Sequence, residues 1–226
     1  MKILKLGQSL GGSNAPSAAT WLPSDEGSLD AWYQKGVGIT LAGSDVSIWL
    51  DSSTNSNDMR QTDATEMPAY SAGVLTFDGT GENMQTAGQV SLSGDFTIGA
   101  KINVGASLGT LLGDNTTVGE WLRFINTTDM RVKIDNASAV DLSLNGGLTW
   151  GDGYIVITRR SGTLNMYWKG ALQTDTETLT GTADIDAIGV RKTDLNPYNG
   201  TVEEIQIFSS SSLALTANVN ARLSSL

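Results

Sequence analysis

Two pairs of carboxylates could serve acid–base chemistry if the fold placed each pair in a cleft. Asp184 and Asp186 are two positions apart, so on a β-strand their side chains would point to the same face. Glu203 and Glu204 are adjacent and would point to opposite faces, and no third carboxylate completes either set. We expect Asp184 and Asp186 to be solvated strand or turn residues, with calcium ligation as the alternative. The sequence therefore predicts no catalytic residues.

A second group of oxygen-bearing side chains is concentrated in residues 51–58. Asp51, Asn55, Asn57 and Asp58 carry the carboxylate and amide oxygens that Ca²⁺ prefers. Their spacing does not follow the EF-hand pattern, and short polar side chains of this kind often accept hydrogen bonds from the backbone of their own turn. We expect an Asx-turn loop and no cofactor, and a Ca²⁺ site at these four residues is the alternative.

Two further segments combine aromatic and amide side chains in a way that suits sugar binding. A pyranose ring stacks on an exposed aromatic ring while its hydroxyls hydrogen-bond to Asn and Asp. The candidate ligand-binding residues are Asp114, Asn115, Trp121, Asn196, Tyr198 and Asn199. Because Trp and Tyr in β proteins more often fill the core or a sheet edge, a structural role is the leading interpretation of the aromatic residues.

The composition removes several kinds of chemistry. The chain has no Cys and no His, which excludes disulfides, thiol catalysis and the usual general base of serine and cysteine hydrolases. Its 14 basic and 24 acidic residues give a net charge of -10, which would repel a nucleic-acid backbone. No stretch approaches the roughly 20 apolar residues that span a bilayer. We therefore expect neither nucleic acid nor membrane insertion.

The elements that must position these residues are predicted to be strands. Only the C-terminus shows helical spacing, with Leu215, Val219 and Leu223 four positions apart and Thr216 as the expected cap. The pattern predicts an all-β, two-layer antiparallel jelly-roll sandwich over residues 24–226, closed by a short C-terminal helix. Runs rich in β-branched and aromatic residues, bounded by Gly, Asn, Asp or Ser, cover residues 46–50, 74–77, 96–104, 110–112, 121–125, 130–134, 154–158, 164–168, 185–190 and 201–208.

Residues 1–23 differ from the rest and are predicted to form an N-terminal arm and linker. Residues 11–20 are rich in Gly, Ser and Ala, a composition that buries too little apolar area to fold alone. We expect the apolar residues of the arm to bind a partner, by adding a strand to an exposed sheet edge, and the chain to be a homo-oligomer. These partner-binding residues are Ile3, Leu4, Leu6 and Leu10.

Several segments together resemble the concanavalin A-like, or laminin G-like, domains. The first is the run from Trp49 to Asp58, in which Thr54 and Ser56 replace the usual glycines. The others, in order, are residues 67–70, 75–79 with Phe-Asp-Gly, 96–98, the paired runs 154–159 and 164–170, and finally 188–189, 198–200 and 202–208. Enzymes of this superfamily carry a Glu-X-Asp-X-X-Glu pattern on one strand face, and the chain has no such run.

The resemblance and the arm lead to one expected function and two alternatives. Within this family, the chain most resembles virion structural proteins of tailed phages, in its short arm and its high content of Ser, Thr and Asn. We expect a non-enzymatic capsid decoration, fibre or adhesion module located in the virion, with other virion proteins as partners and a host surface glycan as a further one. The first alternative is a carbohydrate-binding, lectin-like adhesin, and the second is a glycoside hydrolase of the same fold, because this fold hosts all three classes.

Overall fold

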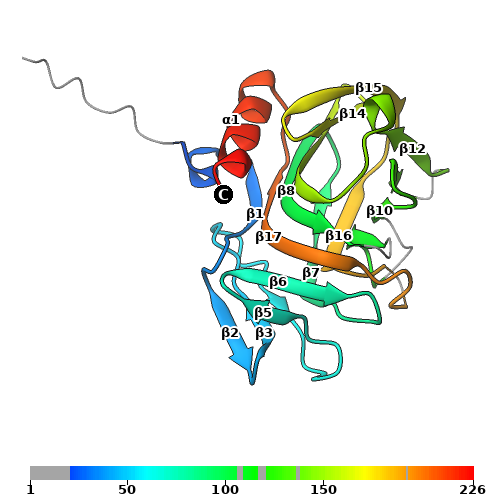
Figure 1. The fold of residues 1–226 in the computed structure, drawn as a ribbon. Coiled ribbons are helices and arrows are strands. Elements are labelled where there is room, and N and C mark those ends of the chain that lie inside the picture. The colour runs from blue at the N-terminus through cyan, green and yellow to red at the C-terminus, as the bar shows by residue number, and fades with distance from the viewer. Residues whose placement is uncertain (1–20, 106–108, 117–120, 136–137, 192) are drawn as a thin grey trace, which may run out of the picture.

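The structure, a computed structural model, describes residues 21–105, 109–116, 121–135, 138–191 and 193–226. These residues form 17 strands, two short 3-10 turns and one α-helix, so the predicted all-β class with a short C-terminal helix is confirmed (Figure 1). The elements are η1 (Pro23–Asp25), β1 (Leu29–Tyr33), β2 (Ile39–Ala42), β3 (Asp45–Trp49), β4 (Met59–Arg60), β5 (Ala69–Ser71), β6 (Val74–Asp78), β7 (Met84–Leu92), β8 (Phe96–Val104), β9 (Thr110–Gly113), β10 (Trp121–Phe124), β11 (Asp129–Lys133), β12 (Val140–Ser143), η2 (Asn145–Gly147), β13 (Asp152–Arg160), β14 (Thr163–Trp168), β15 (Ala171–Thr178), β16 (Ala183–Ile188), β17 (Asn199–Phe208) and α1 (Leu213–Ser224).

The strands pair antiparallel in two long series. The first series runs β12, β11, β10, β9, β16, β7, β4, β3 and β2. The second runs β15, β14, β13, β8 and β17, and the free edge of β17 pairs with β6 in its first half and with β1 in its second. Chain neighbours therefore often lie in different series, as in the steps from β8 to β9 and from β16 to β17.

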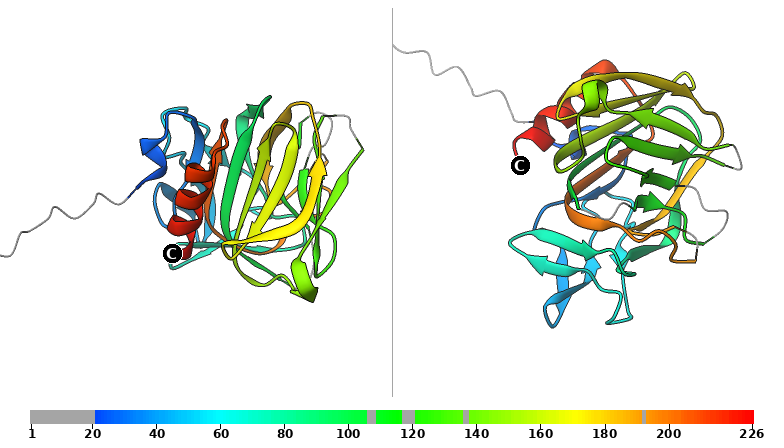
Figure 2. Two further views of the ribbon diagram at one scale, coloured as in Figure 1. Left: turned by 90° about the horizontal axis from the view of Figure 1, so that it is seen from above. Right: turned by 45° about the vertical axis from the view of Figure 1, so that its right-hand side comes forward.

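The two series are joined into one sheet, and the predicted two-layer jelly-roll sandwich is not confirmed beyond the all-β class. Strand β5 pairs with β6 and also with β3, where Ala69 lies opposite Asp45. Hydrogen bonding therefore links all 17 strands into one antiparallel sheet. The sheet curls around the core and nearly closes, with α1 packed on its outside (Figure 2).

The core lies between the two series, and strand alternation decides which side chains enter it. On β11, Met130 and Val132 are fully buried, whereas the residues between and beside them are partly exposed. Large aromatic side chains meet in the same core: Phe124 lies 4.8 Å from Trp150 and 6.1 Å from Tyr198, measured between ring centroids. Burial of this apolar surface is the main source of stability. The alternation also directs the charged residues of β10 and β11 outward.

Helix α1 begins after Ser212, whose side chain accepts a hydrogen bond from the Leu215 amide at 3.0 Å. Ser212 is therefore the cap, and the prediction of Thr216 was wrong by one helical turn. Val219 is fully buried against the outer face of the second series. Gly99 on β8 permits this close approach, because a Cβ atom there would lie 2.5 Å from the side chain of Val219.

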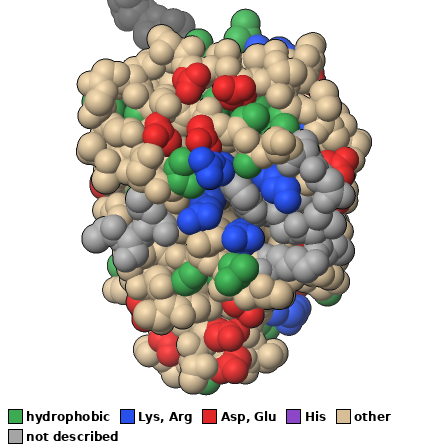
Figure 3. All heavy atoms as spheres, turned by 90° about the vertical axis from the view of Figure 1, so that its right-hand side faces the viewer, with side chains coloured by type: hydrophobic (Ala, Val, Ile, Leu, Met, Phe, Trp, Pro, Cys, Tyr) green, Lys and Arg blue, Asp and Glu red, His purple; other side chains and the backbone are tan. Residues whose placement is uncertain are grey.

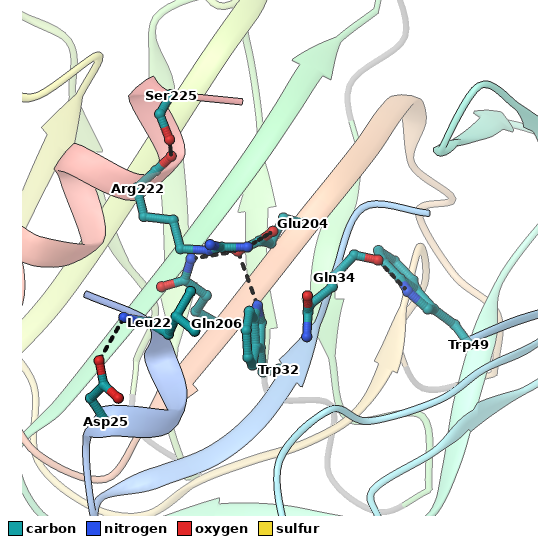
Figure 4. Close-up of polar contacts among 9 residues, drawn as sticks. All are labelled: Leu22, Asp25, Trp32, Gln34, Trp49, Glu204, Gln206, Arg222 and Ser225. Carbon is teal, nitrogen blue, oxygen red and sulfur yellow. Dashed lines mark hydrogen bonds and ion pairs between the residues drawn. The ribbon is translucent and has the colours of Figure 1, made fainter. Parts of the chain in front are cut away.

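A buried ion pair also holds α1 to the sheet. Glu204 of β17 has no exposed surface, and Arg222 of α1 donates to both of its carboxylate oxygens, at 2.5 and 2.9 Å (Figure 4). The same carboxylate accepts hydrogen bonds from the Trp32 indole at 3.0 Å and from the Gln206 amide at 2.8 Å. The Arg222 guanidinium also lies over the Trp32 ring, 4.9 Å from its centroid. Charge and hydrogen bonds of Glu204 are thus satisfied inside the fold.

Candidate functional site

Two loops that are distant in the sequence, one after β9 and one after β16, meet beside β9 in the middle of the first strand series. The Asn115 side chain donates a hydrogen bond to Asp194 at 2.8 Å and accepts one from the Asp194 backbone amide at 3.2 Å. The Asn196 carbonyl accepts from the Thr110 amide at 2.9 Å. We call residues 114–116 together with 193–196 the loop junction. The junction brings together three of the residues predicted to bind a ligand, Asp114, Asn115 and Asn196.

Glycines let the second loop lie directly on β9. A Cβ atom at Gly109 would lie 2.0 Å from the Pro197 carbonyl oxygen, and one at Gly113 would lie 2.4 Å from the Val190 carbonyl oxygen. Any side chain at either position would push the loop away. Asp194 and Asn196 both have positive φ angles, 55° and 54°, which Asp and Asn tolerate better than most residues. The residue types at Gly109, Gly113, Asp194 and Asn196 therefore permit the path of this second loop.

A pair of buried carboxylates supports the junction from below. Asp114 accepts hydrogen bonds from Gln89 at 3.1 Å and from the Thr116 amide at 2.8 Å. Asp186 of β16 accepts from the Asn115 amide at 2.6 Å and from the Thr116 hydroxyl. Burial raises the pKa of Asp186 above its ordinary value, hydrogen bonds from Thr116 and Asn115 act against that rise, and the nearby Asp114 charge adds to it. Asp114 and Asp186 thus both accept hydrogen bonds from Thr116. Because the pKa of Asp186 is raised, this pair of carboxylates can hold a proton.

Basic side chains lie beside the junction on the outer face of β10 and β11. Arg123 lies directly opposite Arg131 in the strand register, and Arg131 makes a bidentate pair with Asp141 at 2.6 and 2.7 Å. Arg191 donates to the Asn196 side chain at 2.7 Å, which connects this group to the junction. Lys and Arg side chains gather on the corresponding face of the molecule, with acidic side chains above and below them (Figure 3). We call Arg123, Arg131 and Arg191 the arginine cluster.

The other candidate sugar-binding residues lie elsewhere. Tyr198 is fully buried, packs edge-on against Phe77 and donates to the Asn103 carbonyl at 2.9 Å, which is the structural role expected of an aromatic residue. Burial raises the pKa of Tyr198 far above its ordinary value. Asn199 donates to the Asp78 carbonyl at 2.6 Å and so ties β17 to the end of β6. Trp121 begins β10 and pairs with Lys133, and its side chain is outside the described part of the structure.

The loop proposed as a calcium site uses its oxygens for its own hydrogen bonds. Asp51 accepts from the amides of Trp32, Ser53 and Asn57 at 2.8 to 3.0 Å. Asn55 and Asn57 both donate to the Asp30 carbonyl, at 3.0 and 2.9 Å. Within the described ranges, no group of three or more His, Cys, Asp and Glu side chains could hold a metal ion. These contacts match the predicted Asx-turn loop, and the calcium alternative stays a prediction.

The arm residues Ile3, Leu4, Leu6 and Leu10 lie outside the described residues. In the part of the chain that the structure describes, no helix is long and apolar enough to cross a membrane. Three surface hollows lie away from the junction, beside Trp21 and Arg222, beside Arg159, and beside Glu26 and Ser53. None of the three is lined by a described residue that the sequence predicted to bind a sugar.

Comparison with solved structures identifies sialidases as structural relatives. The chain superposes on Trypanosoma rangeli sialidase in complex with 2,3-difluorosialic acid, a covalent intermediate, with a TM-score of 0.60 at 13% identity over 89% of this chain. It also superposes on T. rangeli sialidase (TM-score 0.58, 14% identity, 89% of this chain) and on its mutant displaying trans-sialidase activity (0.59, 14%, 88%). The chain spans about a third of the length of these sialidases, 33% in each case. No family model matches the sequence, and no curated protein matches it.

This likeness establishes an all-β fold shared with part of a sialidase, and it corrects two expectations. The expected non-enzymatic virion structural protein of a tailed phage is contradicted, because the structural relatives are sialidases, which are glycoside hydrolases. The expectation that the chain is not an enzyme is contradicted by the same finding. Both expectations rested on the N-terminal arm and on the order of the strand motifs. Such features indicate a fold, and one fold can carry several functions.

Proposed function

We propose that the chain is a carbohydrate-active domain that binds a saccharide at the loop junction. The observation that carries this proposal is the meeting of Asn115, Asp194 and Asn196 where the loops after β9 and β16 pack together. Their amide and carboxylate groups are the donors and acceptors that sugar hydroxyls require. Asn115 and Asn196 are partly exposed and Asp194 is exposed, so a ligand can reach them. The fold shared with part of a sialidase supports a saccharide as the ligand.

A glycan array that contains neutral and acidic oligosaccharides tests this proposal. We expect the wild-type protein to bind a defined subset and the Asn115→Ala variant to lose at least about tenfold in affinity, because sugar hydroxyls would lose an amide partner. Asn220→Ala is the matched control, since Asn220 lies on α1 and donates within the helix to the Thr216 carbonyl. Absence of wild-type binding across the array, or equal binding by both variants, would reject the junction as a sugar site.

A second candidate function is hydrolysis of a glycosidic bond, and the Asp114 and Asp186 pair favours it. Glycoside hydrolases combine a carboxyl group that stays protonated with a second, ionised carboxylate. The raised pKa of Asp186 suits the protonated role, and Asp114 is the neighbouring carboxylate. Asp186→Asn preserves the shape of the side chain but cannot transfer a proton. We expect this variant to keep saccharide binding and lose turnover of an aryl glycoside, and turnover equal to wild type would remove this candidate.

The proposed function is accompanied by a more specific fold for the curled sheet. We propose that the curled sheet is a jelly roll of the concanavalin A-like, laminin G-like kind. The ordered series of motifs in the sequence supports this assignment, from Trp49 through Phe77-Asp78-Gly79 to the final strand. A superposition on an experimentally determined laminin G-like domain tests it, because the same strand order must appear in both proteins.

A further inference from the structure

The outer strands of the two series are protected in different ways, and β2 is the one for which the described residues provide no cover. Strands β12 and β15 cover each other, because the Ser143 amide of β12 donates to the Asp175 side chain of β15 at 2.9 Å. The loop after β3 covers β1: the Trp32 amide donates to Asp51 at 2.9 Å, and the Trp32 carbonyl accepts from the Ser52 amide at 2.7 Å. Strand β6 pairs with β5.

Strand β2 pairs only with β3 in the part of the chain that the structure describes. Thr40 directs its carbonyl toward β3, where it accepts a hydrogen bond from the Ser47 hydroxyl at 3.1 Å. Because consecutive residues of an antiparallel strand direct their N–H and C=O groups to opposite sides, those of Ile39 and Leu41 face away from β3. Such a row of backbone groups at an open edge is a template for the addition of another strand.

The side chains of β2 lack the features that normally keep an exposed edge from pairing. Its sequence, Ile-Thr-Leu-Ala, contains no charged residue and no proline. Leu41 is 45% exposed, and Val37 before β2 and Leu50 after β3 are 47% and 42% exposed. The hairpin of β2 and β3 forms one extremity of the molecule (Figure 1). Exposed apolar side chains around an open edge indicate a surface that a partner covers.

The charge around β2 indicates which kind of strand can bind there. Residues 34–83, the lobe that includes β2 to β6, contain seven carboxylates and two basic residues, a net charge of -5. Both basic residues are already paired, Lys35 with Glu203 and Arg60 with Asp58. Acidic side chains are visible at the lower end of the molecule, where this lobe lies (Figure 3). Two such lobes repel each other, so the β2 strands of two copies are poorly suited to pair, and a basic strand is favoured.

The N-terminal arm has the charge and the spacing that the β2 edge requires. The first 24 residues contain two lysines, Lys2 and Lys5, and no carboxylate. Three leucines of the arm are separated by even numbers of positions, so in a strand they would share one face and Lys5 would lie on the other. These leucines are Leu4, Leu6 and Leu10. A strand of this composition would add apolar contacts on one face and positive charge beside an acidic lobe.

We propose that residues 3–10 of a second copy bind as an added strand along the open edge of β2. Main-chain hydrogen bonds to Ile39 and Leu41 supply affinity, and the arm leucines cover the exposed apolar side chains. This inference concerns assembly, goes beyond the proposed saccharide function and does not involve the loop junction.

The place where the described chain begins favours exchange between two copies. Trp21 packs 6.3 Å from Phe208, measured between ring centroids, and lines a hollow beside α1 with Arg222. Helix α1 lies near the top of Figure 1 and the β2–β3 hairpin at the bottom. An arm bound to its own β2 would have to cross that length on a linker of ten residues, which extends to at most about 36 Å. Two copies that exchange arms instead form two equivalent contacts in a closed dimer.

Sedimentation velocity of the full chain over a range of concentrations tests the dimer. We expect the double variant Leu4→Ser with Leu6→Ser to dimerise at least about tenfold more weakly than wild type, because two apolar side chains no longer leave water. Leu41→Lys should also weaken the dimer, since a lysine at the edge repels the basic arm. Leu172→Lys is the matched control, because Leu172 is 52% exposed on β15, whose edge is covered. A wild-type protein that stays monomeric, or a dimer that the arm variant leaves unchanged, would overturn the inference.

Cross-linking between introduced cysteines locates the contact, and the chain has no cysteine of its own to interfere. Leu6→Cys and a size-tagged Leu41→Cys protein are mixed and treated with a short bismaleimide reagent. We expect a product that joins one tagged and one untagged chain, and only background when Leu172→Cys replaces Leu41→Cys. Absence of the mixed product would overturn the inference. A link formed within a single chain that carries both Leu6→Cys and Leu41→Cys, in a monomeric protein, would also overturn it, because the arm would then cover its own edge.

Discussion

Asn115 and Asp194 exchange two hydrogen bonds across a sequence separation of 79 residues, one from each partner. This contact connects the loop after β9 to the loop after β16 and holds the side chains of both loops together. Because Asn196 continues from the same loop to Arg191, the contact also aligns the junction with the arginine cluster. The proposed saccharide site depends on this arrangement.

A double-mutant cycle should show that the two residues stabilise the fold together. We expect Asn115→Ala and Asp194→Ala each to lower the free energy of unfolding, with a coupling energy of about 1 kcal/mol, the usual value for such hydrogen bonds. Urea denaturation of the wild type, both single variants and the double variant measures it. Additive effects would mean that the two loops hold their positions independently.

Asp186 should make the protein lose stability as pH rises. Burial raises the folded-state pKa of Asp186, so the folded protein binds this proton more tightly than the unfolded chain does. The contribution of Asp186 is fully present below its ordinary pKa and is lost as pH rises through the raised folded-state value. Asp186→Asn removes this dependence. The difference in Tm between variant and wild type should therefore grow, in favour of the variant, from acid toward neutral pH, and a constant difference would contradict the assignment.

Asp51 should stabilise its loop without a metal ion. Its carboxylate accepts three backbone hydrogen bonds and one from the Ser53 hydroxyl at 2.6 Å. We expect Asp51→Ala to reduce the free energy of unfolding by about 1–3 kcal/mol, because buried amides lose their acceptor. Addition of a chelator should leave the Tm of the wild type unchanged. A drop on chelation that is absent in Asp51→Ala would instead establish the calcium site.

Removing Arg222 alone should lower the free energy of unfolding more than removing the charges of Glu204 and Arg222 together. Arg222→Met leaves the fully buried Glu204 carboxylate without its counterion, and we expect a loss of about 3–5 kcal/mol. The double variant Glu204→Gln with Arg222→Met should recover part of that loss. Thermal and urea denaturation of the three proteins measure it. A double variant less stable than Arg222→Met would show that the glutamate stabilises the sheet through Trp32 and Gln206 instead.

Most strands with a buried hydrophobic face were predictable from the sequence, although β7, which buries Met84, Val90 and Leu92, was missed. Strands without a hydrophobic pattern were missed as well. The run that became β11 alternates Met130 and Val132 with charged residues, so its pattern identified it. Strand β15 has a single buried position, Gln173, and owes its place to pairing with β14. The joining of the two strand series through Ala69 depends on long-range pairing, which local patterns do not encode.

The polar half of the candidate site could be predicted, and the charged half was missed. Asp114, Asn115 and Asn196 drew attention because their residue types suit sugar hydroxyls. Arg123 was missed because its proximity to Arg131 follows from the register of a hairpin and its proximity to Arg191 from a loop packed on β9. The hairpin did leave a signal, since both arginines are flanked by apolar residues, and the two runs are separated by the polar residues 126–128.

Chemical-shift mapping with a saccharide that binds on the glycan array tests the central claim most directly, because it locates the bound saccharide on the folded protein. The probe is titrated into ¹⁵N-labelled protein while the backbone and side-chain amide signals are followed. We predict that the largest changes occur at Asn115, Asp194 and Asn196, with little change on α1. Changes centred on the hollow beside Trp21 and Arg222, or no changes at saturating probe, would contradict a saccharide site at the loop junction.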